Sequence, residues 1–283
     1  MDNSSFTAQN VPHYCVVGDP IEHSRSPEIH QAFARQVGLE LVYEKVRVKA
    51  GALKETVWEF FQAGGVGLNV TTPLKQEAWS LASRRSRHSD LAKAANTLWF
   101  EEGDIVCDNT DGVGLIRDLE QNLSFSLRNK IVLLLGAGGA ACGVMPALLK
   151  AGVSELLVSN RTDARAEDLV DSYGRNRKVA VLRWGDETER RPDLIINATS
   201  ASLESELPNL ASSCIHSNVF CYDLMYSASE TSFVSWAKNK NVALATDGLG
   251  MLVEQAAESF KIWNRKKVET GPVIAMVRKS YLR

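Results

Sequence analysis

Residues 130–152 read KIVLLLGAGGAACGVMPALLKAG, and this stretch decides the fold. Its apolar opening is typical of a buried strand, the glycines that follow favour a tight turn, and the remainder suits a helix. Nineteen of these residues, 131–149, carry no charge and are nearly enough to span a bilayer. The glycines and Pro146 within them favour a strand, a turn and a helix over a membrane span.

The glycine turn at 136–141 fits the pattern G-x-G-x-x-[GA], between the end of a strand and the start of a helix. Gly136 permits the tight turn, Gly138 lets the backbone approach a pyrophosphate, and Ala141 allows close packing of the helix on the strand. A pyrophosphate would then lie against the free N–H groups of the helix start. The pattern predicts a dinucleotide site, and a glycine-rich turn without a ligand is the alternative.

The next expected strand, 155–160, closes a βαβ unit and is followed by two arginines. Asn160, Arg161 and Thr162 stand at its end, with Arg165 one helical turn later. NAD-binding domains usually carry Asp or Glu here for the ribose 2′-hydroxyl group. Two guanidinium groups instead suit a 2′-phosphate, which arginine binds in a charge-assisted fork. The sequence therefore favours NADP over NAD, and a solvated arginine-rich turn is the alternative.

The alternation of strand and helix continues on both sides of this unit. Strands are expected at 14–18, 42–48, 67–71, 95–100, 105–109, 179–184, 194–199, 219–224 and 242–246. Helices are expected at 27–38, at 53–63, from Pro73 onward and at 251–263. The pattern predicts an N-terminal α/β domain that contains a hairpin, followed by a doubly wound parallel sheet of the Rossmann type.

Composition is that of an average globular protein with about two domains: 283 residues, 45% hydrophobic and 23% charged. The net charge of −2 provides no broad basic field for nucleic acid or a membrane surface, so local sites must hold any anionic ligand. The five cysteines form no CxxC pair, and the five histidines show no zinc-like spacing with them. We expect a cytoplasmic protein without a metal site or an N-terminal signal peptide.

Two polar clusters lie in the N-terminal part. Ser26, before Pro27, suits a helix N-cap, but Ser24 does not, and two hydroxyl groups beside free helix N–H groups would also bind a carboxylate. Lys75 falls in the first turn of the helix expected from Pro73, where a cation costs ~0.3–1 kcal/mol against the helix dipole. That field favours the neutral amine, as a proton-transferring lysine requires. The polar run at 108–112 could by itself be only a loop or a cap.

From about Tyr14 to its end, the chain resembles the shikimate dehydrogenase family. The resemblance rests on GDPIEHSRSPEIH (18–30), NVTTPLK (69–75), AANTL (94–98), DNTDGVG (108–114), GAGGA (136–140), SNRTDAR (159–165), INATS (196–200), YDLMY (222–226) and DGLGMLVEQA (247–256). It implies a reversible, NADPH-dependent reduction of 3-dehydroshikimate to shikimate, in the route to chorismate and aromatic amino acids. No metal takes part.

The resemblance also implies a role for individual residues. Lys75 matches the catalytic lysine and Asp111 its partner. The implied substrate contacts are Ser24, Ser26, Asn69, Thr71, Asn96, Tyr226 and Gln255. The implied cofactor contacts are Gly136, Ala137, Gly138, Gly139, Ala140, Asn160, Arg161, Thr162, Arg165, Leu224 and Gly248.

Domain bounds follow from the same resemblance: a substrate domain at 1–111 with 248–283, and an NADP domain at 112–247. One alternative is a quinate/shikimate dehydrogenase with broader substrate and cofactor use, against which Thr71 and the run at 160–162 speak. A catalytically silent nucleotide-binding module would not need Lys75 together with Asp111. The partner is a small molecule rather than nucleic acid or a membrane, and both a monomer and a homodimer stay open.

The chain departs from the family pattern at four places, one of which is the loop after Tyr226, where a frequent proline is missing. Arg87 stands where an acidic residue is frequent, Lys93 where glycine is frequent, and Ala-Ser-Leu at 201–203 where Gly-Met or Gly-Ile is usual. The basic residues at 84–93 either add contacts to the NADP phosphates or form a solvated face. In the family, residues 201–203 border the nicotinamide, so this departure bears on how the cofactor fits.

Overall fold

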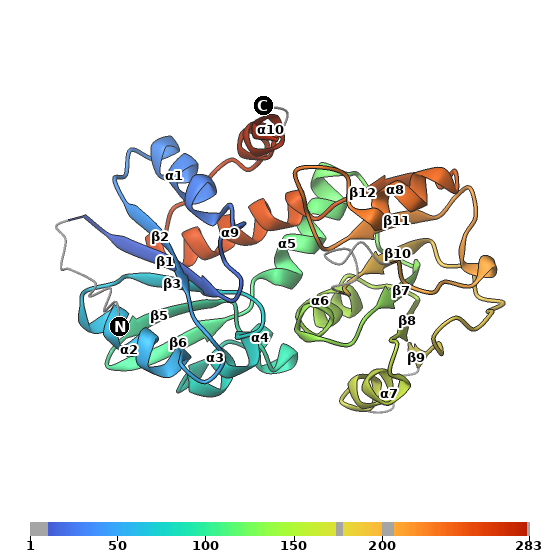
Figure 1. The fold of residues 1–283 in the computed structure, drawn as a ribbon, viewed down its shortest axis with the longest axis horizontal. Helices are drawn as coiled ribbons and strands as arrows, with labels where there is room; N and C mark the ends of the chain where they lie inside the picture. Colours follow the sequence, from blue (N-terminus) through green and yellow to red (C-terminus); the bar gives the residue numbers. More distant parts are fainter. Residues whose placement is uncertain (1–10, 174–177, 200–206, 282–283) are drawn as a thin grey trace. The chain divides into compact units, whose positions relative to one another are not determined.

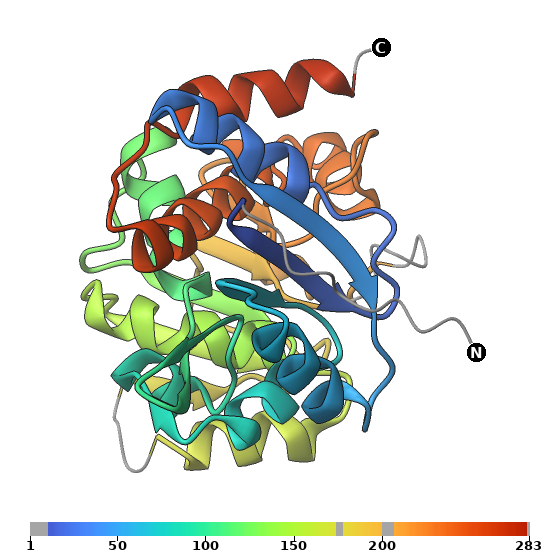
Figure 2. The same ribbon diagram turned by 90° about the vertical axis from the view of Figure 1, so that its left-hand side faces the viewer.

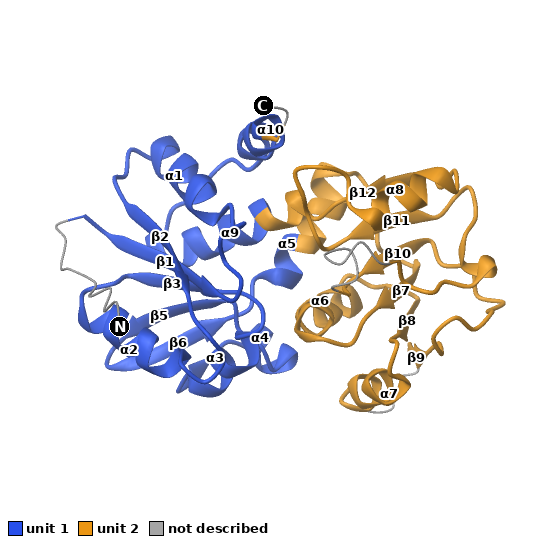
Figure 3. Ribbon diagram, in the orientation of Figure 1, with its two compact units in different colours: residues 1–114, 253–280 blue, residues 115–252, 281–283 orange. Residues whose placement is uncertain are grey.

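The computed structural model describes residues 11–173, 178–199 and 207–281, which form two compact units (Figure 3). Unit 1 contains the described residues up to Gly114 together with Val253–Ser280, and unit 2 contains those of Leu115–Leu252 together with Tyr281. The C-terminal helices thus belong to the same unit as the N-terminal strands. Within the described ranges, every helix is too short or too polar to cross a membrane.

Unit 2 is built on a parallel sheet with helices on both faces, which confirms the predicted doubly wound fold (Figure 1). Its strands are β7 (Ile131–Leu135), β8 (Glu155–Ser159), β9 (Val179–Val181), β10 (Leu194–Asn197), β11 (Phe220–Asp223) and β12 (Leu244–Thr246). Its helices are α6 (Gly139–Lys150), α7 (Asp163–Asp171) and α8 (Ser232–Asn239). The order β12-β11-β10-β7-β8-β9 is that of dinucleotide-binding domains, with a switch point between β7 and β10.

Alternate residues of β7 point to opposite faces of this sheet. Leu134 packs in the cluster that contains Val144 of α6, whereas Leu133 packs in the cluster that contains Phe233 of α8. Both faces are therefore buried, which explains the unbroken apolar run at 131–135. The uncharged stretch that was nearly long enough to span a bilayer comprises β7 and most of α6.

Unit 1 is built on a mixed sheet with the order β2-β1-β3-β5-β6-β4. Its strands are β1 (His13–Gly18), β2 (Val42–Arg47), β3 (Gly67–Val70), β4 (Arg84–Arg85), β5 (Thr97–Glu101) and β6 (Asp104–Asp108). Its helices are α1 (Ser26–Gln36), α2 (Leu53–Gln62), α3 (Lys75–Leu81), α4 (Arg87–Ala92) and α10 (Gly271–Ser280), with parts of α5 (Asp111–Arg117) and α9 (Leu249–Asn264). Strands β5 and β6 form the expected hairpin.

Helices cover both faces of the unit 1 sheet (Figure 2). Cys15 of β1 packs in the cluster that contains Phe60 of α2. Its neighbour Tyr14 packs instead against Trp263 of α9, with ring centroids 5.2 Å apart. Successive residues of one strand thereby place α2 and α9 on opposite sides.

Several expected boundaries were wrong by one to three residues, among them the following. The helix expected from Pro73 begins at Lys75, because the Leu74 N–H group donates to the Thr71 carbonyl group at 3.0 Å and closes a turn first. The strand expected at 179–184 ends at Val181, before a bend at Gly185. The helix expected at 251–263 spans Leu249–Asn264, and the sequence analysis did not delimit α10.

Candidate active site

Lys75 and Asp111 form an ion pair between the first residues of α3 and α5. Lys75 Nζ lies 2.6 Å from Asp111 Oδ2, and the side chains are 16% and 1% exposed, respectively. The Asp111 N–H group donates to Asn109 Oδ1 at 3.0 Å, so the polar run at 108–112 leads into the helix that begins at Asp111. The buried carboxylate offsets the cost of a cation at the start of α3 and holds the amine in place. The expectation that Lys75 lies in a first helical turn is confirmed.

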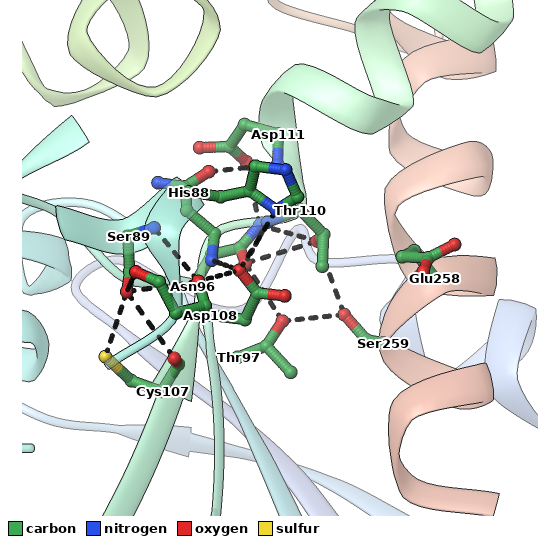
Figure 4. Close-up of polar contacts among 12 residues, drawn as sticks. His88, Ser89, Asn96, Thr97, Cys107, Asp108, Thr110, Asp111, Glu258 and Ser259 are labelled. Carbon is green, nitrogen blue, oxygen red and sulfur yellow. Dashed lines mark hydrogen bonds and ion pairs between the residues drawn. The ribbon is translucent and has the colours of Figure 1, made fainter. Parts of the chain in front are cut away.

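Asn96 joins Asp111 to the rest of the polar cluster (Figure 4). Its Nδ2 group lies 2.9 Å from Asp111 Oδ1, 3.0 Å from Thr110 Oγ1 and 3.4 Å from Gln255 Oε1. Its Oδ1 atom accepts from the Thr97 hydroxyl group and the Thr110 N–H group, each at 2.9 Å. The Asn96 side chain therefore hydrogen-bonds with residues of β5, α5 and α9, which are far apart in the sequence.

Asn69 extends the cluster on β3. Its Nδ2 group donates to the Asn96 carbonyl group at 2.9 Å and to Ser259 Oγ at 3.1 Å. Its Oδ1 atom accepts from the Tyr43 hydroxyl group at 2.6 Å. Both ends of the amide are thus fixed by neighbours within unit 1.

Four polar residues of this cluster were not predicted: Tyr43, Thr97, Thr110 and Ser259. Thr97 and Thr110 adjoin predicted residues within the AANTL and DNTDGVG motifs. Ser259 is fully buried one helical turn after Gln255, on the face that also carries Phe260, and a serine there was a usable signal. Tyr43 gave no such signal, because a tyrosine in an alternating strand is ordinary core.

The expected capping role of Ser26 was wrong. Arg25 holds the N-cap position of α1, Ser26 is the first helical residue, and no side chain caps the helix. Instead, Ser24 Oγ accepts from the Ser26 N–H group at 3.3 Å and donates to Ser26 Oγ at 3.2 Å. Both serines are buried, at 7% and 8% exposure. Two adjacent hydroxyl groups that are not used in capping remain able to turn towards an anion.

Thr71 follows β3 directly. Its N–H group donates to the Val17 carbonyl group at 2.9 Å, and its methyl group occupies the space that a side chain at Gly18 would need. Within the described chain its hydroxyl group makes no hydrogen bond. The backbone and the methyl group hold the residue in place, and the hydroxyl group is left for a ligand.

In unit 2, the three glycines of the glycine turn have different roles. The backbone conformation requires glycine at Gly136, whereas Gly138 and Gly139 border open space. Gly136 has φ +105°, and a Cβ atom there would lie 3.0 Å from the Ala198 carbonyl oxygen. A Cβ atom at Gly138 or Gly139 would meet nothing within 4 Å. Helix α6 begins at Gly139 without a side-chain cap, so its first N–H groups are left for an anion.

The loop after β8 is tied to the glycine turn. Asn160 Oδ1 accepts from the Ala137 N–H group at 3.2 Å, and Asn160 Nδ2 donates to the Thr162 carbonyl group at 2.9 Å. Arg161 and Arg165 are exposed, and no ion pair joins either to another residue of the described chain. Two unpaired guanidinium groups next to the phosphate-binding turn suit a further phosphate.

The last predicted cofactor residues are Leu224, which follows β11, and Gly248, which follows β12. The Leu224 N–H group donates to the Asn197 carbonyl group, and the Gly248 N–H group donates to the Met225 carbonyl group, both at 2.9 Å. A Cβ atom at Gly248 would lie 2.4 Å from the Leu224 carbonyl oxygen, so only glycine fits there. Tyr226 lies on the same loop as Leu224, in unit 2, and is half-buried.

The structure explains some of the residues that depart from the family pattern. Lys93 ends α4 with φ +47°, a backbone conformation that favours glycine. Arg84 pairs with Glu101 and Glu102, and the Arg85 guanidinium group lies 4.3 Å from the centre of the Trp79 ring. These contacts favour a solvated basic face. Residues 201–203 lie outside the described residues.

The cysteines are free thiols, and four of the five are buried. Burial raises the pKa of Cys221 to about 12, so this thiol stays protonated and packs as a small apolar side chain. Among the described residues, no group of three or more His, Cys, Asp and Glu side chains is placed to hold a metal ion.

Three family models match consecutive parts of the chain. The shikimate dehydrogenase substrate binding domain matches residues 16–98, shikimate/quinate 5-dehydrogenase 118–213 and the shikimate 5′-dehydrogenase C-terminal domain 248–275. The shikimate dehydrogenase (NADP(+)) of Alkalilimnicola ehrlichii is 47% identical, covering 94% of this chain and 98% of that protein. The protein of the same name from Hahella chejuensis is 48% identical with the same coverage.

Solved structures give the same result. An Ael1 enzyme from Pseudomonas putida has a TM-score of 0.87 and 41% identity, covering 94% of this chain and 97% of that chain. Shikimate 5-dehydrogenase from Thermus thermophilus, in complex with NADP(H) and shikimate, has a TM-score of 0.85 and 30% identity, covering 95% and 100%. Together with the curated relatives, which match over nearly their whole length, these findings show that the chain belongs to the shikimate dehydrogenase family.

Proposed function

We propose that this protein is an NADP-dependent shikimate dehydrogenase, which interconverts 3-dehydroshikimate and shikimate in the route to chorismate and aromatic amino acids. The observation that carries the proposal is the buried ion pair between Lys75 and Asp111, which Asn96 joins to Gln255. A nucleotide-binding module without catalytic activity would have no use for this pair. Relatives named shikimate dehydrogenase (NADP(+)) at 47% and 48% identity support the same activity and cofactor.

The residues of unit 1 supply acid–base chemistry. When bound, NADPH supplies the hydride to the ketone carbon, and the ketone oxygen then acquires negative charge. Lys75 donates a proton from Nζ to that oxygen, and in the reverse direction its neutral amine accepts the proton. Asp111 holds Nζ at 2.6 Å and stabilises its charged form. Asn96 in turn fixes the other carboxylate oxygen of Asp111.

Substrate recognition in this proposal starts at the serine pair. The Ser24 and Ser26 hydroxyl groups turn from each other towards the substrate carboxylate, which fixes one end of the ring. The remaining proposed contacts to the substrate are Asn69, Thr71, Asn96, Gln255 and Tyr226. A fixed ring presents its reacting carbon in a constant position relative to Lys75.

The residues of unit 2 fit NADP. The open space at Gly138 and Gly139, with Ala137 and Ala140 beside them, accommodates a pyrophosphate against the uncapped start of α6. The proposed site for the ribose and its 2′-phosphate is formed by Asn160, Arg161, Thr162 and Arg165. Leu224 and Gly248 are proposed to line the nicotinamide end.

One assay tests the function directly. Shikimate or quinate is supplied with NADP or NAD, and the absorbance of the reduced nicotinamide is followed. We expect the highest kcat/KM for shikimate with NADP. The model described as shikimate/quinate 5-dehydrogenase keeps one competitor open: a larger signal with quinate and NAD would establish the broader enzyme instead. The absence of any shikimate-dependent signal would contradict the proposal.

Two glycine substitutions distinguish the effect of the glycine turn on NADP binding from its effect on stability. Gly138→Ala should raise KM for NADP about ten-fold and leave the free energy of unfolding unchanged, because its Cβ atom meets open space. The matched change Gly136→Ala should lower the free energy of unfolding by about 1–3 kcal/mol, because φ is +105° there. Chemical denaturation and NADP titration measure the two effects. Equal destabilisation by both changes would refute this division.

We also propose that unit 1 corresponds to the substrate domain, 1–111 with 248–283, and that unit 2 corresponds to the NADP domain, 112–247. The enzyme acts in the cytoplasm on a small molecule, as a monomer or a homodimer. Sedimentation equilibrium distinguishes a monomer of 31.1 kDa from a dimer.

A further inference from the structure

Arg183 lies at the carboxyl end of β9, beside the loop that is proposed to bind the ribose phosphate of NADP. Strands β8 and β9 are parallel, and Val158 pairs with Val181 in their register. The Leu182 N–H group donates to the Val158 carbonyl group at 2.9 Å, which continues the pairing beyond the end of β9. In this register, Arg183 is the position opposite Asn160, the first residue after β8.

The face of the sheet on which Arg183 lies follows from the packing of its neighbours. Alternate residues of an extended chain point to opposite faces. Val179 packs in the cluster that contains Ala166 of α7, whereas Leu182 packs against the cluster that contains Phe233 of α8. The alternation therefore persists to the residue before Arg183. It places Arg183 on the face covered by α7, the helix that lies beside β9 (Figure 1).

A hydrogen bond joins the residue after Arg183 to the start of α7. The Trp184 N–H group donates to Oδ1 of Asp163, the first residue of α7, at 3.4 Å. Asp163 stands between Arg161 and Arg165 in the sequence. Three arginines therefore lie around one helix start, and they come from the loop after β8, the first turn of α7 and the end of β9.

The Arg183 guanidinium group is available to a ligand. Arg183 is exposed, and its carbonyl group accepts from the Asp186 N–H group at 3.1 Å, in a turn that contains Gly185 at φ +83°. None of the residues that the structure describes forms an ion pair or a hydrogen bond with its side chain. A phosphate can therefore bind this group without breaking a contact inside the protein.

The charges at this helix start favour a third cation. Arg161 and Arg165 with the carboxylate of Asp163 carry a net charge of +1. A phosphate monoester carries about −1.5 to −2 at neutral pH and has three strong acceptor oxygens. Arg183 raises the local charge to +2, which balances such a group and supplies further donors for its oxygens.

We propose that Arg183 is a third residue that binds the 2′-phosphate of NADP and contributes to the preference for NADP over NAD. This inference rests on the proposed function. The cofactor contacts implied by the family resemblance for the ribose phosphate all come from residues 160–165. Arg183 adds a contact from a second strand, so the phosphate is bound from the side of β9 as well as from α7.

The test measures binding rather than turnover. Isothermal titration calorimetry gives the dissociation constants of NADP, NAD, adenosine 2′,5′-bisphosphate and AMP. Arg183→Ala should weaken the binding of NADP and the bisphosphate about ten-fold, and that of NAD and AMP less than about two-fold. Arg183→Lys keeps the charge without the planar fork and should lose less than the alanine variant. An unchanged ratio of the NADP and NAD dissociation constants in Arg183→Ala would overturn the inference.

Arg128→Ala is the matched control. Arg128 is exposed and precedes β7, so it lies at the amino ends of the parallel strands, whereas dinucleotides bind beyond the carboxyl ends. Its removal changes the net charge by the same amount, and all four dissociation constants should stay at the wild-type values. An equal loss of NADP binding in Arg128→Ala would trace the effect to net charge and overturn the inference. A wild-type protein that prefers NADP but does not turn over shikimate would refute only the proposed function, so the two failures are distinguishable.

Discussion

Replacement of Lys75 by alanine should lower kcat for shikimate oxidation about 10³-fold, within the range that general acid–base catalysis supplies. In the direction of oxidation, the Lys75 amine that Asp111 holds at 2.6 Å is the proton acceptor in the proposed reaction, and alanine cannot replace it. NADP affinity should stay at the wild-type value, because the residues proposed to bind NADP belong to unit 2. Steady-state kinetics and fluorescence titration with NADPH measure the two quantities.

A loss of stability must be separated from this loss of catalysis. Lys75→Ala leaves Asp111 as a buried charge without its cation, which costs several kcal/mol unless the carboxyl group takes up a proton. The double variant Lys75→Ala/Asp111→Asn removes both charges, and should regain stability without regaining activity. Lys54→Ala is the matched control, because Lys54 is an exposed lysine in the first turn of α2. Near-wild-type turnover in Lys75→Ala would show that another group transfers the proton.

The double variant Arg161→Ala/Arg165→Ala should raise KM for NADP by roughly 10²–10³-fold and change KM for NAD little. Each guanidinium group is exposed and has no ion pair within the described chain, so its interaction with a 2′-phosphate is not offset by a lost internal contact. The cofactor preference should therefore move towards NAD. Kinetic measurements with both cofactors at saturating shikimate give the ratio.

The control for this variant is another exposed arginine of unit 2. Arg191 precedes β10 and so lies at the amino ends of the parallel strands, whereas ligands of such sheets bind beyond the carboxyl ends. Arg191→Ala should leave both KM values unchanged. An equal rise for NADP and NAD in the double variant would place the two arginines on a part that both cofactors share.

The sequence predicted correctly the elements whose residue pattern is strong. The predicted boundaries were wrong where two neighbouring residues could each begin a helix. The run at 131–135 and its glycine turn are confirmed, because a buried parallel strand and a positive φ each restrict the residue types strongly. The predicted start of α3 was wrong. Proline is common in the first turn of a helix, but here Pro73 lies two residues before the helix begins. The prediction that Ser26 is the N-cap of α1 was also wrong. Ser26 is the first helical residue, and its N–H group donates to the Ser24 hydroxyl group.

For the candidate site, the family resemblance identified individual residues but not the hydrogen bonds between them. Lys75 and Asp111 were expected to act together, and the structure brings them into contact. The contact between Asn96 and Gln255 joins residues 159 positions apart, and no local pattern encodes such a pairing. Tyr43 was missed because its hydroxyl group, and not its apolar ring, places it in the site.

Asn96 has a further consequence for how the enzyme tells related molecules apart. Its two N–H bonds already serve three acceptors, of which Gln255 is the most distant at 3.4 Å. In the proposed site, we expect a substrate hydroxyl group that reaches this amide to take the place of Gln255, and an analogue without that hydroxyl group to let Gln255 return. Because no buried group is left unsatisfied in either case, Asn96 tolerates such analogues. We therefore expect the sharper rejection of analogues at Thr71, whose hydroxyl group makes no hydrogen bond within the described chain.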